Sequence, residues 1–104
     1  LDGEDTTTVS VLNSNLPKQI NLFNIYPNPF NPTTHIGYTV FTESDVQIQV
    51  FDIKGSVITN FNIQKVSIGE HVVTWDAKNY PSGLYFVKIM INQDVQTKKI
   101  LFLK

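Results

Sequence analysis

The chain has 104 residues, a formal net charge of −1, 41% hydrophobic residues and 12% aromatic residues, which fits one domain with a core of its own. Without cysteine it cannot form disulfides, use thiol catalysis or bind metal through thiolates. Its eight basic residues are all lysines, which argues against nucleic-acid binding, and no apolar run approaches the roughly 20 residues of an integral membrane segment.

The first 19 residues are expected to form a linker or flexible N-terminal segment. Asp2, Glu4 and Asp5 and a run of threonines leave little apolar surface to bury. The chain begins with Leu1 instead of Met, so we interpret it as a piece of a longer protein. The folded domain is predicted over residues 20–104.

From residue 20 onward, apolar and polar residues alternate with the period of two that is typical of β-strands. Turn-forming residues separate the alternating runs. Seven strands are predicted, over residues 20–26, 35–40, 45–52, 56–63, 70–75, 83–91 and 95–103. No window has the pattern of an amphipathic helix, so the chain is predicted to be an all-β antiparallel sandwich of about seven strands.

The alternation also predicts which residues are buried and where the chain turns. Trp75 alternates with His71 and Val73 and is expected in the core, whereas Tyr80 is expected outside. Residues 52–55 form a predicted hairpin turn in which Gly55 has a positive φ, and Gly83 is expected to need a similar conformation. In the last strand both faces carry apolar residues, and Leu101 and Leu103 are expected to close the sandwich.

The run of alternating prolines in residues 26–32 is the most unusual local feature. Proline at every second or third position favours an extended segment. Asn28 is expected to bond to its own backbone in an Asx turn, while Tyr26 and Phe30 cover the open end of the sandwich. A proline-rich ligand for a partner is the alternative interpretation.

The candidate catalytic and metal-binding residues do not form a recognised pattern. His35 and His71 lie in different strands without other ligands at metal-binding spacing, so packing roles are expected. Ser82, His71 and Asp76 could be chosen as a triad, but no nucleophile elbow accompanies them. Asp52 and Asp76 stand in turn positions, where Asp bonds to backbone amides. We expect no enzyme activity and no cofactor.

The order of several motifs resembles the immunoglobulin-like C-terminal sorting domains of type IX (Por) secretion. Any one motif is weak, but five occur in order over about residues 22–104. The motif residues singled out as structural are Tyr26, Pro27, Asn28, Pro29, Phe30, Asp52, Gly55, Trp75, Asp76, Ser82, Gly83 and Tyr85. The terminal segment singled out for recognition is Lys98, Lys99, Ile100, Leu101, Phe102, Leu103 and Lys104. The region of residues 75–86 is also similar to the immunoglobulin-like domain of the flagellar hook-capping protein.

The resemblance implies a non-catalytic domain that directs the export of an upstream cargo across the outer membrane. Its implied partners are the outer-membrane translocon and the associated sorting peptidase. The implied localisation is the periplasm in transit and then the cell surface or medium, with cleavage or surface attachment possible in the family. The alternative function is an immunoglobulin-like binding module, for carbohydrate or protein, appended to a secreted enzyme.

Overall fold

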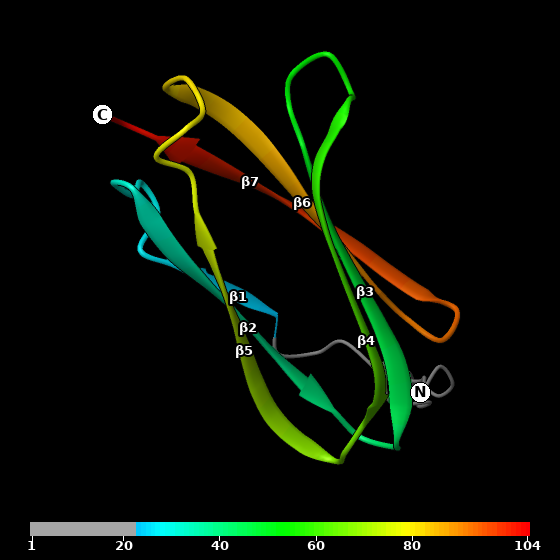
Figure 1. Cartoon of the computed structure of the whole chain (residues 1–104). Helices are drawn as coiled ribbons and strands as arrows, with labels where there is room; N and C mark the ends of the chain where they lie inside the picture. The colour runs from blue at the N-terminus through cyan, green and yellow to red at the C-terminus, as the bar shows by residue number, and fades with distance from the viewer. Residues whose placement is uncertain (1–22) are drawn as a thin grey trace, which may run out of the picture.

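The computed structural model describes residues 23–104, and these residues form two antiparallel sheets packed face to face (Figure 1). The smaller sheet has the strand order β1-β2-β5 and the larger has the order β4-β3-β6-β7. The strands are β1 (Asn24–Tyr26), β2 (Thr33–Val40), β3 (Ser44–Phe51), β4 (Val57–Val66), β5 (Gly69–Asp76), β6 (Gly83–Ile91) and β7 (Asp94–Phe102). The predicted all-β sandwich is confirmed, and the expected N-terminal linker lies outside the described residues.

The two-residue alternation explains how each strand contributes to the core. In β2 the inward residues Ile36, Tyr38 and Val40 are buried, and their neighbours on the outer face are partly exposed. β3 and β6 follow the same pattern and pair with each other, so Ile48 lies opposite Ile89. The core therefore forms between the inward faces of the two sheets. None of the described residues belongs to a helix that could span a membrane.

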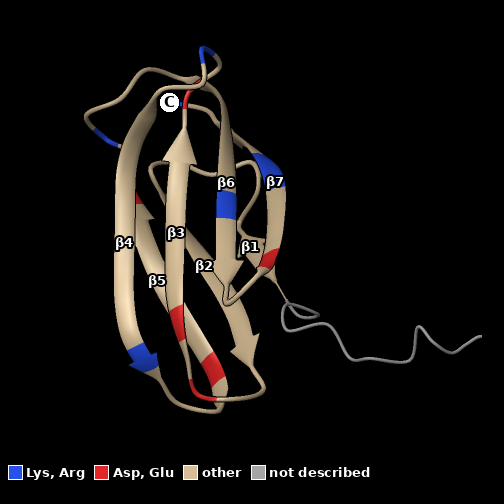
Figure 2. Ribbon diagram, turned by 90° about the vertical axis from the view of Figure 1, so that its right-hand side faces the viewer, with Lys and Arg blue, Asp and Glu red and all other residues tan. Residues whose placement is uncertain are grey.

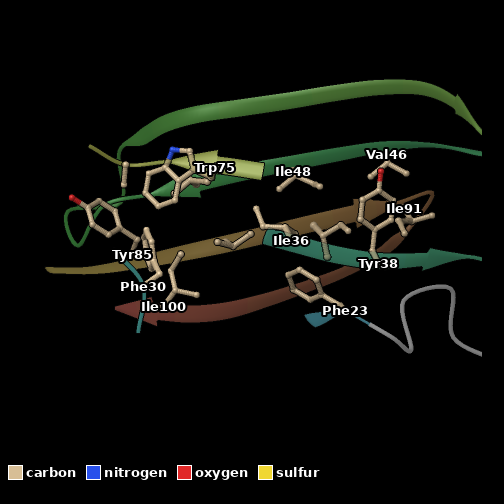
Figure 3. Close-up of a cluster of buried hydrophobic side chains, with 14 of the residues drawn as sticks. Phe23, Phe30, Ile36, Tyr38, Val46, Ile48, Trp75, Tyr85, Ile91 and Ile100 are labelled. Carbon is tan, nitrogen blue, oxygen red and sulfur yellow. The ribbon is translucent and has the colours of Figure 1, made fainter. Parts of the chain in front are cut away.

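An aromatic cluster closes one end of this core (Figure 3). Trp75 is 3% exposed, which confirms its predicted position. Its ring makes an edge-to-face contact with Tyr85, with centroids 5.3 Å apart, and lies 5.6 Å from the ring of Phe30. Phe30 stacks on Phe102 at 5.1 Å. Tyr80 is partly buried against Trp75 at 5.9 Å, so its prediction as an exterior aromatic is wrong.

The turns follow the sequence closely. Asp52 accepts hydrogen bonds at Oδ1 from the backbone amides of Lys54 (2.9 Å) and Ser56 (3.0 Å). Gly55 has a φ of 85° and Gly83 has a φ of 150°, as expected. Both glycines relieve backbone strain that a side chain would introduce.

The predicted face of the last strand is wrong. Ile100 and Phe102 are buried in the core, whereas Leu101 is only partly buried and Leu103 is 49% exposed. The pairing of β6 with β7 decides this, because Ile100 lies opposite the inward-facing Tyr85. Apolar residues on both faces of the segment left the alternation ambiguous, and the register resolved it.

The proline-rich segment is also different from the prediction. Residues 27–32 bend between β1 and β2 instead of continuing as an extended segment. Phe30 is buried at the end of the sandwich, but Tyr26 is 50% exposed on the outer face of the smaller sheet. There its ring approaches Gly37, where a Cβ atom would lie 3.6 Å from Tyr26 Cε1.

Candidate functional site

The motif residues of the sequence gather at one end of the sandwich. The β1–β2 bend, the turn after β3, the loop between β5 and β6, and the end of β7 all lie there, as chain direction and register require (Figure 1). Thr33 pairs with Asp76, and Gly83 pairs with Phe102. Motifs that are up to 78 positions apart in sequence numbering, from Tyr26 to Lys104, therefore form one structural unit.

The proline-rich bend holds the free edge of β7. Asn28 donates from Nδ2 to the Lys99 carbonyl (3.2 Å) and accepts at Oδ1 from the Leu101 amide (3.0 Å). The Phe30 amide donates to the Leu101 carbonyl, and the Leu103 amide donates to the Phe30 carbonyl, both at 3.0 Å. The Asn28 side chain thus bonds to the edge of β7 in the way that the backbone of a neighbouring strand would. We call these four hydrogen bonds the Asn28–Phe30 clamp.

The clamp corrects the role that the sequence suggested for Asn28. An Asx turn would bond this side chain to its own backbone, but both bonds reach β7, more than 70 residues away. No local pattern signals such a long-range contact. The edge of β7 is not open to a partner strand over Lys99–Leu103, because the clamp occupies the Lys99 and Leu101 carbonyls and the Leu101 and Leu103 amides.

The seven residues predicted for recognition divide into buried and accessible groups. Ile100 and Phe102 are in the core, and Leu101 is partly buried. The side chains open to a partner are Lys98, Lys99, Leu103 and Lys104.

Two of the accessible lysines have further contacts. The ammonium group of Lys98 lies 5.5 Å from the ring centroid of Phe23, a distance suited to a cation–π interaction. The backbone amide of Lys104 donates to Ser82 Oγ at 3.0 Å, which joins the end of β7 to the loop before β6. Lys98 therefore contributes to packing as well as to surface charge.

The candidate catalytic residues are not brought together. His71 Nε2 lies 2.8 Å from the Ser67 carbonyl, Asp76 Oδ1 accepts from the Lys78 amide, and Ser82 Oγ accepts from Lys104. His71 and Asp76 are five positions apart along the extended strand β5, a span of about 16 Å. These three side chains cannot form a triad in this arrangement.

The second histidine also has structural partners. His35 Nδ1 lies 3.0 Å from Thr74 Oγ1, and its ring lies 5.6 Å from that of Tyr26. Across residues 23–104 no three His, Cys, Asp or Glu side chains are grouped as metal ligands would be. Both histidines thus make the packing contacts that the sequence indicated.

Burial raises the pKa of two tyrosine hydroxyl groups. It raises the pKa of Tyr38 above its ordinary value, because the phenolate would lose its hydration. The pKa of Tyr85 is also raised, first by burial and then by the negative charge of Asp52. Tyr85 donates a hydrogen bond to the Pro81 carbonyl at 2.5 Å. Both groups stay neutral at physiological pH and serve packing at the core.

Comparison with known proteins gives one family and one fold. The family model for the secretion system C-terminal sorting domain matches residues 24–103. Among solved structures, the CARDB domain of a Pyrococcus furiosus protein, crystallised in complex with di-metal ions, has a TM-score of 0.50 and 11% sequence identity. That match covers 90% of this chain and all of the solved chain, and it supports the fold alone. No curated protein matches the chain.

Proposed function

The chain belongs to the secretion system C-terminal sorting domain family, and from that membership we propose that it directs an upstream cargo across the outer membrane by the type IX route. The observation that carries the proposal is the extent of the match, residues 24–103, which includes the bend, the aromatic cluster and β7. The domain acts as a non-catalytic passenger tag. Its partners are the outer-membrane translocon and the associated sorting peptidase.

The proposed recognition element is the folded end of the sandwich, not a linear peptide. Ile100 and Phe102 are core residues, so a partner reaches them only if the domain unfolds. Lys99, Leu103 and Lys104 remain accessible beside the clamp. The clamp bonds to the backbones of Lys99 and Leu103, and Ser82 Oγ accepts from the Lys104 amide. Export is followed by cleavage or surface attachment of the cargo in this proposal, and the cargo finishes at the cell surface or in the medium.

A reporter fusion tests the proposal. The 104-residue chain is fused behind a reporter with a periplasmic leader and expressed in a bacterium that has type IX secretion. We expect the reporter in the surface or medium fraction. If the unmutated fusion stays in the periplasm, the sorting function is contradicted and the binding-module alternative is favoured.

Lysine variants then separate recognition from folding. Lys99→Gln with Lys104→Gln is expected to lower export while leaving the melting temperature nearly unchanged, since exposed charges contribute at most about 1 kcal/mol each. Lys65→Gln with Lys78→Gln is the control that removes the same charge elsewhere. Lys98→Gln is made separately because of its contact with Phe23. Full export of the folded Lys99/Lys104 variant would show that the translocon does not recognise these two charges.

A further inference from the structure

The outer face of the larger sheet carries an apolar patch near its motif-bearing end. Six side chains at this end of the face are aromatic or aliphatic and are not buried in the core: Phe51, Val57, Leu84, Phe86, Leu101 and Leu103. Val57, Leu84 and Leu103 are between 40% and 49% exposed. Monomeric domains rarely leave a large connected apolar surface without a use.

The strand register shows that this patch is continuous. Phe51 lies opposite Val57 on β4 and opposite Phe86 on β6. One step nearer the end, Leu84 lies opposite Leu101 on β7. All four strands of the sheet therefore contribute to the patch or border it.

The turn after β3 extends the patch at its tip. Ile53 is 71% exposed, the most exposed large apolar side chain among residues 23–104. A hollow of about 270 Å³ between this turn and the start of β6 is lined by both Ile53 and Leu84. The turn itself is held rigidly by the two amide bonds to Asp52, so Ile53 is presented outward by a fixed backbone.

Lysines border the patch. Lys99 lies opposite Phe86 in the sheet, Lys54 follows Ile53, and the ammonium of Lys88 lies 5.9 Å from the ring centroid of Phe51. We call the six apolar side chains, together with Ile53, Lys54, Lys88 and Lys99, the apolar–lysine surface. The carboxylate of Asp52 in the turn beside this surface accepts hydrogen bonds from two backbone amides.

The remaining acidic residues of the larger sheet lie at its opposite end. Asp45 is the second residue of β3, Asp94 begins β7, and Glu43 precedes β3 (Figure 2). Figure 2 looks onto this sheet and shows the Asp and Glu colour concentrated away from the C-terminus. Lys54, Lys88 and Lys99 thus lie at or beside the apolar patch, while Glu43, Asp45 and Asp94 are remote from it. Lys65 and the exposed Val95 lie at the far end with these acidic residues.

We propose that the apolar–lysine surface docks the folded domain on an anionic lipid surface. Anionic headgroups attract lysines at the membrane boundary, and apolar side chains at the same level enter the region between headgroups and acyl chains. The cores of protein–protein interfaces are enriched in arginine and depleted of lysine, whereas the cations around this patch are all lysines. Ile53 enters the lipid first, with Lys54 at the headgroups.

Vesicle sedimentation of the whole 104-residue chain tests the proposal. Vesicles of phosphatidylcholine alone are compared with vesicles that also contain phosphatidylglycerol, at low and high salt. We expect binding to the anionic vesicles that weakens as salt screens the lysines. Lys54→Gln is expected to lower the partition coefficient about fivefold, and Ile53→Ser about tenfold through lost apolar burial.

Matched variants at the other end of the sandwich are the controls. Ile68 is 70% exposed, so Ile68→Ser removes an equally exposed isoleucine, and Lys65→Gln removes a lysine beside it. Both are expected to bind vesicles as the unmutated chain does. Unfolding transitions of all four variants establish that they are folded.

Three results would overturn the proposal. The first is equal sedimentation of the chain with neutral and anionic vesicles. The second is an equal loss of vesicle binding in the Ile53→Ser and Ile68→Ser variants. The third is concentration-dependent self-association through this face without vesicle binding, which would make a second copy the occupant. Vesicle binding and reporter export are separate measurements, so a failure here leaves the proposed sorting function standing, and the reverse also holds.

Discussion

Replacing Asn28 by alanine tests whether the Asn28–Phe30 clamp stabilises the end of β7. The change removes two hydrogen bonds, one to the Lys99 carbonyl and one from the Leu101 amide. A net contribution of roughly 0.5–1.5 kcal/mol for each bond, reduced because water can replace both at this exposed position, gives an expected loss of about 1–2 kcal/mol. The backbone bonds of Phe30 remain, so the domain should still fold.

Urea unfolding followed by tryptophan fluorescence measures this loss. The chain has a single tryptophan, and Trp75 lies 5.6 Å from Phe30, the residue that the clamp positions. Asn31→Ala is the matched control, because Asn31 also precedes a proline in the same bend and makes no side-chain hydrogen bond with residues 23–104. Free energies of unfolding at independent sites add to within about 0.3 kcal/mol. If those of the two variants differ by less than this, the clamp does not stabilise β7.

Three further predictions concern the core, the backbone and pH. Trp75→Ala should lower the free energy of unfolding by about 3–5 kcal/mol in circular-dichroism melts, and a loss under about 1 kcal/mol would contradict its core position. Gly83→Ala should cost about 1–2 kcal/mol from backbone strain alone, since a Cβ there meets nothing within 4 Å; Gly37→Ala, where φ is ordinary, should cost clearly less in the same urea titration. Because burial raises the pKa of Tyr38, the folded chain holds that proton more tightly than the unfolded chain, so stability should fall as pH rises above about 10. Tyr38→Phe should make the loss shallower in alkaline melts, and an unchanged slope would contradict this assignment.

The strands and turns could be predicted from sequence because their signals are local. In β3 the alternation of Val46, Ile48 and Val50 with polar neighbours defines both strand type and buried face. The turn at Asp52 depends on residues within four positions of one another. The motif order likewise indicated the family that the match over residues 24–103 shows.

The errors arose where distant contacts decide the outcome. The face of β7 depends on its register with β6, because Leu101 and Phe102 are equally apolar and only pairing places Phe102 inside. The role of Asn28 depends on a strand edge more than 70 residues later. Tyr26 is exposed because β1 pairs with β2 so that Tyr26 lies opposite the outward-facing His35, while its neighbour Ile25 lies opposite the buried Ile36.

The clamp has a consequence for the order in which this domain can mature. Its two halves, Asn28–Phe30 and Lys99–Leu103, stand near opposite ends of the described chain, and Phe102 completes the aromatic stack on Phe30. Until β7 is available to pair with it, the early bend cannot form the clamp and Phe30 stays uncovered. Contacts between such distant segments slow folding in general. The domain therefore completes its core only after nearly all of it has been translated, and a chain broken off before residue 102 would leave the early half without its partner.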